Sequence, residues 1–217
     1  MHFPLVPAKA GTQTKQQLDF RLRGNERGGE TQQMNDSQTH AETTPFWRFS
    51  LHFYRHAGVS DACIVLQDEQ GVDVNLLLFL FWLADDGRLL AADEVKKLDD
   101  AVRDWRNLTI VPIREARRKL KGARTVVDPA AQEVFRNKVK AVELDAERLQ
   151  QAALFAFTKG KPLGREAEPQ AAARGNLAAY EHVIGARFAK NAVDVLMAAF
   201  DTIAHGAFAA ASAAAGE

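Results

Sequence analysis

Residues 66–84 read LQDEQGVDVNLLLFLFWLA, and this stretch decides the fold. A mostly polar segment, 67–73, leads directly into an almost uninterrupted apolar run from Val74 to Ala84. Helices on a protein surface are apolar on one side only, whereas a helix that is apolar all round is covered by other elements. We therefore predict a central buried helix with polar side chains gathered at its start.

Helical periodicity continues on both sides of this run. Apolar spacings of three and four, together with capping residues, predict helices over about 45–57, 60–70, 92–108 and 113–121. The longest helix begins at Asp128-Pro129, and the last one covers 184–199. The longest carries an apolar seam, of the kind that packs against another helix, at Phe135, Val139, Val142, Ala146, Leu149 and Ala153.

The predicted fold class is all-α, a compact bundle of five to seven helices. The seam of the helix over 135–153 and a similar seam over 184–199 predict that these two helices pack antiparallel as a long C-terminal hairpin. Residues 45–206 form the predicted single helical domain. Residues 1–44 show no apolar period and are predicted to be disordered, and the Ala-rich segment 207–217 is predicted to fray. We interpret 1–33 as an upstream extension from a misassigned start codon, with translation beginning at Met34.

Composition excludes several classes of protein. Lys+Arg and Asp+Glu are equal at 28 each, so no global charge points to nucleic acid, which is not expected as a partner. The apolar run is far shorter than the roughly 20 residues that span a bilayer, and no signal peptide is recognised. We therefore expect a cytoplasmic protein with no membrane partner. Cys63 is the only cysteine and lies in an apolar context, which favours a buried thiol over a reactive one.

The first candidate site is a polar cluster at the junction of the predicted helices over 60–70 and 74–84. Its candidate residues are Gln67, Asp68, Asp73 and Asn75, with Trp82 and Trp105 as candidate pocket walls. Oxygen ligands from two helix ends could hold a hard cation or a small polar ligand, although the spacing does not match a calcium loop. The alternative is structural: Asp73 caps the apolar helix, and Asp68 pairs with Arg106 or Arg114.

The second candidate site is a basic helix face. Seven Lys/Arg and a single acid occur between 106 and 124. Four of the basic residues lie on one side of the helix by the spacing of three and four: Arg114, Arg117, Arg118 and Lys121. This face could bind an acidic partner, or it could be solvated or paired internally with the acidic segment 93–104.

Other patterns give weaker signals. His52 and His56 have the spacing of paired metal ligands on a helix, but no third ligand accompanies them. The acidic residues of 99–104 are interleaved with basic ones, which is typical of a solvated helix face. No nucleophile or phosphate-loop motif occurs. We therefore assign no catalytic residue, no cofactor and no metal ligand, and leave open whether the protein is an enzyme.

Several of these motifs together resemble a known family. FWxFSL at 46–51, LQDxxGxDVNLLLF at 66–79, WR at 105–106 and PxRxxRRxLK at 112–121 resemble a proteobacterial family of uncharacterised all-helical proteins, over about residues 45–204. The resemblance implies a cytosolic helical protein and assigns no activity, cofactor or catalytic residue.

Two functions follow from these patterns. The preferred one is a non-enzymatic module that binds a protein partner, or a second copy of itself, through its helix faces. Its contact residues would be the basic face and the seam of 135–153. The alternative is a small-ligand or metal-binding protein, or an enzyme, with its site at the polar cluster.

Overall fold

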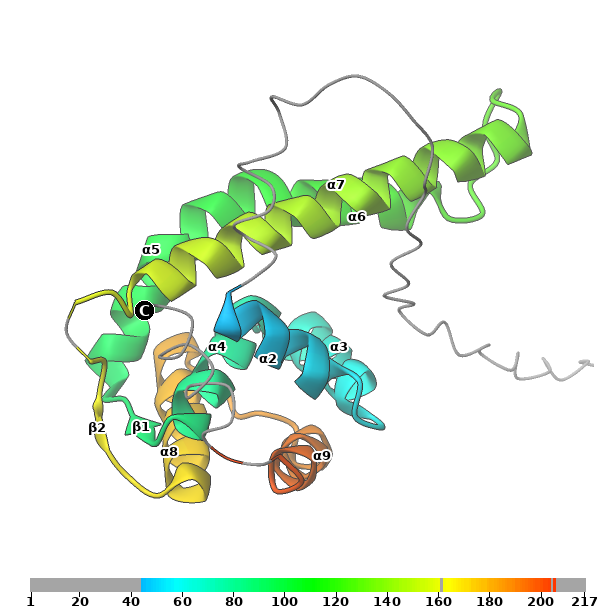
Figure 1. Cartoon of the computed structure of the whole chain (residues 1–217). Coiled ribbons are helices and arrows are strands. Elements are labelled where there is room, and N and C mark those ends of the chain that lie inside the picture. The colour runs from blue at the N-terminus through cyan, green and yellow to red at the C-terminus, as the bar shows by residue number, and fades with distance from the viewer. Residues whose placement is uncertain (1–43, 161, 204, 206–217) are drawn as a thin grey trace, which may run out of the picture. The chain divides into compact units, whose positions relative to one another are not determined.

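The structure is a computed structural model, and it describes residues 44–160, 162–203 and 205. Its elements are numbered as in Figure 1. In chain order they are α2 (Pro45–Tyr54), α3 (Val59–Gln70), α4 (Val74–Asp85), β1 (Arg88–Leu89), α5 (Ala92–Trp105), the π-helical turn η1 (Arg106–Ile110), α6 (Val111–Leu120), α7 (Pro129–Ala156), β2 (Arg165–Glu166), α8 (Pro169–Ile184) and α9 (Lys190–Phe200). The all-α fold class predicted from the sequence is confirmed.

Helix α4 is the centre of the hydrophobic core, as predicted. Every residue from Asn75 to Asp85 is buried, and the helix packs against α2, α7 and α8. Aromatic rings from other helices close around it: Phe46 of α2 meets Phe79 edge-on at 5.0 Å between ring centroids, and Phe200 of α9 lies 5.4 Å from Phe81. Each fully buried Leu or Phe stabilises the fold by roughly 1.5–3 kcal/mol, so this helix supplies a large share of the hydrophobic free energy.

Among the residues that the structure describes, no helix combines the length and the apolar character that a bilayer span needs.

Helices α5 and α6 form one continuous rod through η1. The sequence predicted a break before Pro112, because proline cannot donate the backbone hydrogen bond of an α-helix interior. The chain instead widens for one turn, and the N–H of Val111 donates to the carbonyl of Arg106, five residues back. With this rod counted once, the described residues contain seven continuous helices, within the predicted five to seven.

The predicted C-terminal hairpin is formed differently. Helix α7 pairs with α6, which precedes it, and its distal half extends with α6 beyond the other helices (Figure 1). The helix predicted over 184–199 forms only from Lys190 onward, as α9, and α8 precedes it as a separate helix. Gly185 takes a left-handed conformation at φ 67° and ends α8, so the two helices are not continuous. Helix α9 then packs on α3 rather than on α7. Matching seams on two helices show that each needs a partner but do not show which one.

A small antiparallel sheet joins β1 to β2, with Arg88 opposite Glu166. Asn176 of α8 holds this region from within the core. Its side-chain oxygen accepts from the N–H of Leu90 at 2.8 Å, and its amide nitrogen donates to the carbonyls of Leu80 and Arg88. One buried amide therefore satisfies three backbone groups, the carbonyl of Leu80 within α4 and two groups in the chain that follows this helix.

Three predictions concern residues outside the described part of the chain. They are the disordered segment 1–44, apart from Thr44, the start at Met34, and the fraying tail 207–217. Thr44 itself is the N-cap of α2, and its hydroxyl accepts from the N–H of Trp47 at 3.1 Å.

Candidate functional site

A small polar cavity of about 160 Å³ lies at the start of α4. It is bounded by the end of α3, the first turn of α4, the π-helical turn η1, the start of α6, and α7. Seven polar side chains line it: Gln67, Asp73, Asn75, Arg106, Asn107, Arg114 and Gln150. The structure thus brings three of the four residues of the predicted polar cluster to one cavity.

A sharp turn between α3 and α4 places these residues. Gly71 ends α3 with a left-handed backbone at φ 69°, a conformation that side chains disfavour. Two residues later Asp73 caps α4, and its Oδ1 accepts from the N–H groups of Asn75 at 2.9 Å and Leu76 at 3.3 Å. The capping role predicted for Asp73 is therefore present, and the cap residue also faces the cavity.

Asp73 is buried and held on every side. Its backbone N–H donates to the hydroxyl of Tyr180 on α8 at 2.9 Å, and the amide of Gln150 on α7 donates to its Oδ2. The guanidinium of Arg106 lies 3.7 Å from the same oxygen. Burial raises the pKa of the Asp73 carboxyl, and the charge of Arg106 and these hydrogen bonds offset only part of that rise. A carboxyl that keeps its proton more readily than usual is typical of functional sites, but also of structural networks.

Asn75 joins the first turn of α4 to α7. Its side-chain nitrogen donates to Gln150 at 3.4 Å, and its oxygen accepts from Gln151 at 2.9 Å. All three side chains are buried. The polar residues at the start of the apolar helix are therefore satisfied by amides from a distant part of the chain.

The two arginines of the cavity differ in how their donors are used. Arg114 donates from all three guanidinium nitrogens, to Glu143 at 3.0 Å, to Gln67 at 2.6 Å and to Glu147 at 2.6 Å. Arg106 lies 3.7 Å from Asp73 and 3.9 Å from Asp99, beyond hydrogen-bond distance. The structure shows no hydrogen bond from its guanidinium to any described residue.

The fourth residue of the predicted cluster, Asp68, is not at the cavity. It pairs with Arg118 of α6 at 3.0 Å, and both side chains are nearly half exposed. Arg106 and Arg114, the predicted partners, are paired with other carboxylates, so that part of the prediction is wrong. The helix end turns Asp68 outward, toward the face of α6 that Arg118 occupies.

The predicted basic face is largely paired within the protein. Arg117 donates to both oxygens of Glu143, a carboxylate on α7 that is 5% exposed and that also accepts from Arg114. Lys121 is exposed at the end of α6. The acids that pair with this face are on α7 and α3, and not in the acidic segment 93–104 that the sequence offered as the internal alternative.

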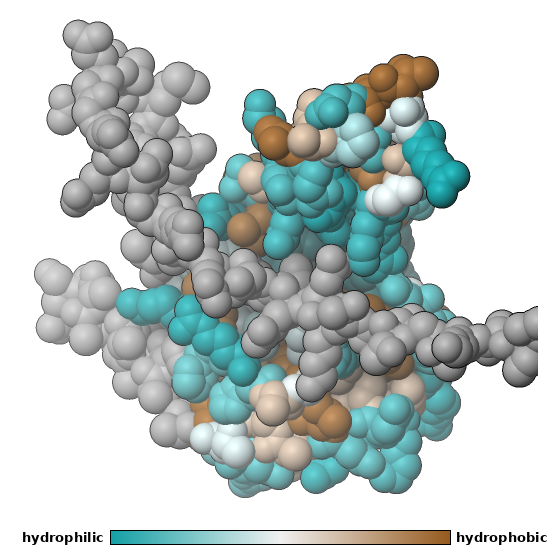
Figure 2. Space-filling model, turned by 90° about the vertical axis from the view of Figure 1, so that its right-hand side faces the viewer, coloured by the Kyte–Doolittle hydropathy of each residue, from teal (hydrophilic) through white to brown (hydrophobic). Residues whose placement is uncertain are grey.

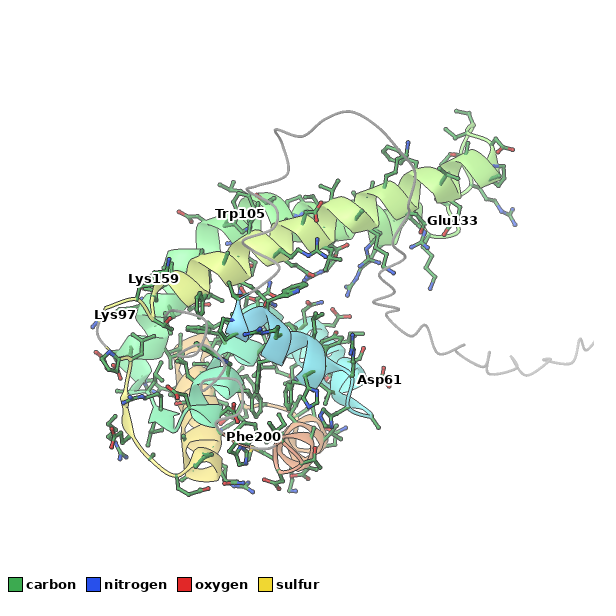
Figure 3. All side chains as sticks on the ribbon, in the orientation of Figure 1. Asp61, Lys97, Trp105, Glu133, Lys159 and Phe200 are labelled. Atoms are coloured by element: carbon green, nitrogen blue, oxygen red, sulfur yellow. The ribbon has the colours of Figure 1, made fainter. Side chains whose placement is uncertain are left out.

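Neither predicted pocket wall lines the cavity. Trp82 lies in the core, stacked 5.6 Å from Phe79 and packed against Phe155. Trp105 is 40% exposed and donates from its indole nitrogen to the carbonyl of Ala146 at 3.0 Å. Figure 3 shows Trp105 at the side of the α5–α7 pair that faces away from α2 and α3.

The weaker motifs form no further site in the part of the chain that is described. His52 and His56 stack edge to face at 5.2 Å, and no group of three metal-ligating side chains occurs there. Cys63 is fully buried, and burial raises its pKa to about 12, so the thiol is unreactive. Asp99 and Asp100 are paired along their own helix, with Arg103 and Lys96 respectively, each at 2.5 Å. Asp99 is buried, so the predicted solvated face does not include it.

Sequence reasoning missed Gln150, Gln151 and the two glutamates of α7 that bind the arginines. A signal was present: Glu143, Glu147, Gln150 and Gln151 share the side of that helix opposite Phe135, Val142 and Leu149. The apolar seam is the stronger pattern in this helix, so it predicts the apolar side as the packing face. In the structure the polar side packs inward.

The fold and the cavity define an all-α protein with a polar junction at the start of its central helix. The chain belongs to the family described as "Protein of unknown function (DUF2390)", which matches residues 45–154. This match covers α2 to nearly the end of α7 and includes every residue of the cavity. No curated protein and no solved structure matches the chain.

Proposed function

We propose that the protein is a helical interaction module that pairs with a second copy of itself through the outer face of α7. The observation that carries this proposal is an apolar stripe on that face, called the outer stripe here. Its residues are Phe135, Val142 and Leu149, exposed by 57%, 53% and 56%. Leu108 of η1 is 80% exposed and Trp105 of α5 is 40% exposed on the neighbouring helix of the pair.

The orientation of α7 supports this proposal. A surface helix ordinarily turns its apolar side to the core. The middle of α7 does the reverse, because it buries Glu143, Gln150 and Gln151 and exposes the outer stripe. Figure 2 shows hydrophobic residues interspersed with hydrophilic ones over the α6–α7 hairpin. The apolar side chains of the outer stripe are each more than half exposed, and apolar surface left open to solvent marks sites where proteins associate.

The spacing of the outer stripe favours a second copy as the partner. Phe135 and Leu149 each lie seven residues from Val142, so the stripe is symmetric about Val142. Two antiparallel copies then place Phe135 of one helix opposite Leu149 of the other. A two-fold interface needs a surface that complements itself in this way.

The charges beside the outer stripe agree with the same arrangement. Lys138 and Asp145 lie on one flank of the stripe, on either side of Val142. In an antiparallel pair centred on Val142, Lys138 of one copy lies opposite Asp145 of its partner. Flanking charges of opposite sign set partner and orientation in helix pairs. Arg114 and Arg117 are not part of the proposed surface, because their guanidinium groups are bound to carboxylates of α7.

Sedimentation velocity over a range of protein concentrations tests the proposal. We expect the wild type to dimerise. Val142→Glu should raise the dissociation constant on the order of 100-fold, because each dimer then buries two unpaired carboxylates. Val126→Glu is the matched control, since Val126 is fully exposed in the loop before α7 and lies off the stripe.

Circular dichroism should show both variants folded, because both valines are more than half exposed. A wild type that stays monomeric at every concentration would contradict the proposal. So would a dimer that Val142→Glu weakens no more than Val126→Glu does.

A further inference from the structure

We propose that the cavity at the start of α4 binds a small monocarboxylate through the guanidinium of Arg106. This inference is independent of self-association, because no residue of the outer stripe lines the cavity. It deepens the alternative that the polar cluster is a ligand site, and it rests on the groups that line the cavity.

The donors of Arg106 are the first observation. The other polar side chains that line the inner wall are used within the protein: Asp73 accepts three hydrogen bonds, and Arg114 donates three. Arg106 donates none to the described residues, although its side chain is only 21% exposed. A guanidinium presents N–H groups in a planar fork that matches the two oxygens of a carboxylate. The cavity wall therefore includes a guanidinium that forms ion pairs at 3.7 Å and 3.9 Å but no hydrogen bond to the described residues.

The backbone beside the cavity is the second observation. The π-helical turn η1 begins at Arg106, and its residues Asn107 and Ile110 also line the cavity. Pro112 gives this turn a local cause, because it lacks the N–H of a regular α-helix. Single π-helical turns inside long helices are frequent at functional sites. Here the wide turn is located where the chain forms the cavity wall.

The size of the cavity limits the ligand. Its volume of about 160 Å³ is below the roughly 300–1,000 Å³ of sites that enclose drug-sized molecules. A carboxylate with a few carbon atoms fits this range. Asn107 is exposed and lines the cavity, so it marks the side from which a ligand can enter.

Charge selects a monocarboxylate over phosphate. Arg106 already faces two buried carboxylates, Asp73 and Asp99, so each further negative charge on a ligand is costly. Phosphate carries between one and two negative charges at neutral pH, and a monocarboxylate carries one. The charged or titratable groups around Asp73 are Arg106 on η1, Glu147 on α7 and Tyr180 on α8. Burial favours the protonated form of Asp73, so uptake of one proton there can balance a monoanion.

Nuclear magnetic resonance on the ¹⁵N-labelled full chain tests the inference, with sodium acetate as the probe. We expect acetate to shift the Nε–Hε signal of Arg106 and the backbone amides of Asn107 and Val111 with saturation. Sodium chloride at equal ionic strength should produce no saturable shift, and sodium phosphate should bind more weakly than acetate. Binding of acetate should be tighter at pH 5.5 than at pH 7.5, because Asp73 is then protonated in a larger fraction of molecules.

Two variants make the test specific. Arg106→Lys keeps the positive charge beside Asp73 and Asp99, so the fold is preserved, but it lacks the fork and should bind acetate at least about tenfold more weakly. Arg187→Gln is the control, since the side chain of Arg187 is 91% exposed, pairs with Glu181 of α8 and does not line the cavity. It should bind within twofold of the wild type.

Three results would overturn the inference. Acetate shifts could be linear and equal to those of chloride, which would mean that the cavity holds only water. Arg106→Lys could bind acetate as the wild type does, or phosphate could bind more tightly than acetate at neutral pH. None of these results bears on the dimer, whose test changes Val142, a residue that does not line the cavity.

Discussion

Replacing Arg117 with glutamate separates a structural role of the basic face from a binding role. Arg117 donates to both oxygens of Glu143, which is 5% exposed. Arg117→Glu removes this partner and places a second carboxylate beside Glu143. Arg118→Glu is the matched change one residue later, at a pair with Asp68 in which both side chains are nearly half exposed.

The expected magnitudes differ because the burial of the two pairs differs. Breaking a buried ion pair costs about 3–5 kcal/mol. Arg114 still binds Glu143 after the change, so Arg117→Glu should lower the free energy of unfolding by about 3 kcal/mol, the lower end of that range. Exposed pairs contribute about 0.2–1 kcal/mol, which is the expected loss for Arg118→Glu.

Urea denaturation followed by circular dichroism measures both losses. With a slope of about 2 kcal/mol per molar urea, the midpoint for Arg117→Glu should fall by about 1.5 M, and that for Arg118→Glu by less than about 0.5 M. Equal midpoints for the two variants would refute the reasoning, because Glu143 would then not depend on Arg117.

Acid supplies a second check on the same pair. Burial would raise the pKa of Glu143, but the hydrogen bonds and charges of Arg117 and Arg114 hold it below its ordinary value. A carboxyl with a lowered pKa stabilises the folded state above its unfolded pKa, and this contribution is lost as the pH falls through the folded pKa. The difference in stability between the wild type and Arg117→Gln should therefore shrink below about pH 4.

The remaining predictions concern the turn, the buried acid and the dimer. Burial raises the pKa of Asp73, so the wild type should lose stability relative to Asp73→Asn as the pH rises above the ordinary aspartate pKa. Denaturation at several pH values measures this loss, and a difference in stability that does not change with pH would contradict the prediction. Gly164→Ala should lower the melting temperature more than Gly71→Ala does, because a Cβ at Gly164 would lie 2.6 Å from a backbone oxygen. At Gly71 only the left-handed backbone opposes a side chain, at a cost of about 1–2 kcal/mol. Equal losses of melting temperature would rule out the close contact. Val142→Cys should form a disulfide between two copies under mild oxidation, seen on a non-reducing gel, since the buried Cys63 gives no background; a dimer that forms without this cross-link would exclude the antiparallel arrangement.

Local features of the fold could be read from the sequence. Asp73 caps its helix as predicted, the longest helix begins at Asp128-Pro129 as predicted, and the apolar run after Asp73 is the buried central helix. Capping and an all-apolar run depend on neighbours within a few residues, so they do not require knowledge of the tertiary fold.

The orientation of α7 could not be read in the same way. Periodicity shows which residues share a face, and the seam through Phe135, Val142 and Leu149 was found correctly. Periodicity does not show which face turns inward, because that depends on what the neighbouring helix offers. Here Arg114 and Arg117 of α6 take Glu143 inward, and the apolar side is left outside.

Only part of the lining of the candidate cavity could be predicted from the sequence. Gln67, Asp73 and Asn75 lie within nine residues of one another, and Gly71 between them signals the turn that joins them. Arg106 and Gln150 come from distant segments, and only the tertiary fold brings them to Asp73. Pro112 predicted a break between two helices. The π-helical turn η1, which keeps α5 and α6 continuous at this point, has no sequence pattern of its own.

The end of the α6–α7 hairpin near its loop is held by hydrogen bonds, whereas the rest of the molecule is held by the hydrophobic core. We therefore expect the two parts to differ in stability. Near the loop, Gln132 holds the hairpin together by donating to the carbonyls of Leu120 and Ala123, both at 3.0 Å, and no hydrophobic cluster of the core extends that far. Local opening there exposes little apolar surface, so its free energy is smaller than that of global unfolding. We therefore expect amide protons of the distal hairpin to exchange with solvent before those of α4, and we expect the end of α7 that bears Phe135 to adjust to a partner without disturbing the core.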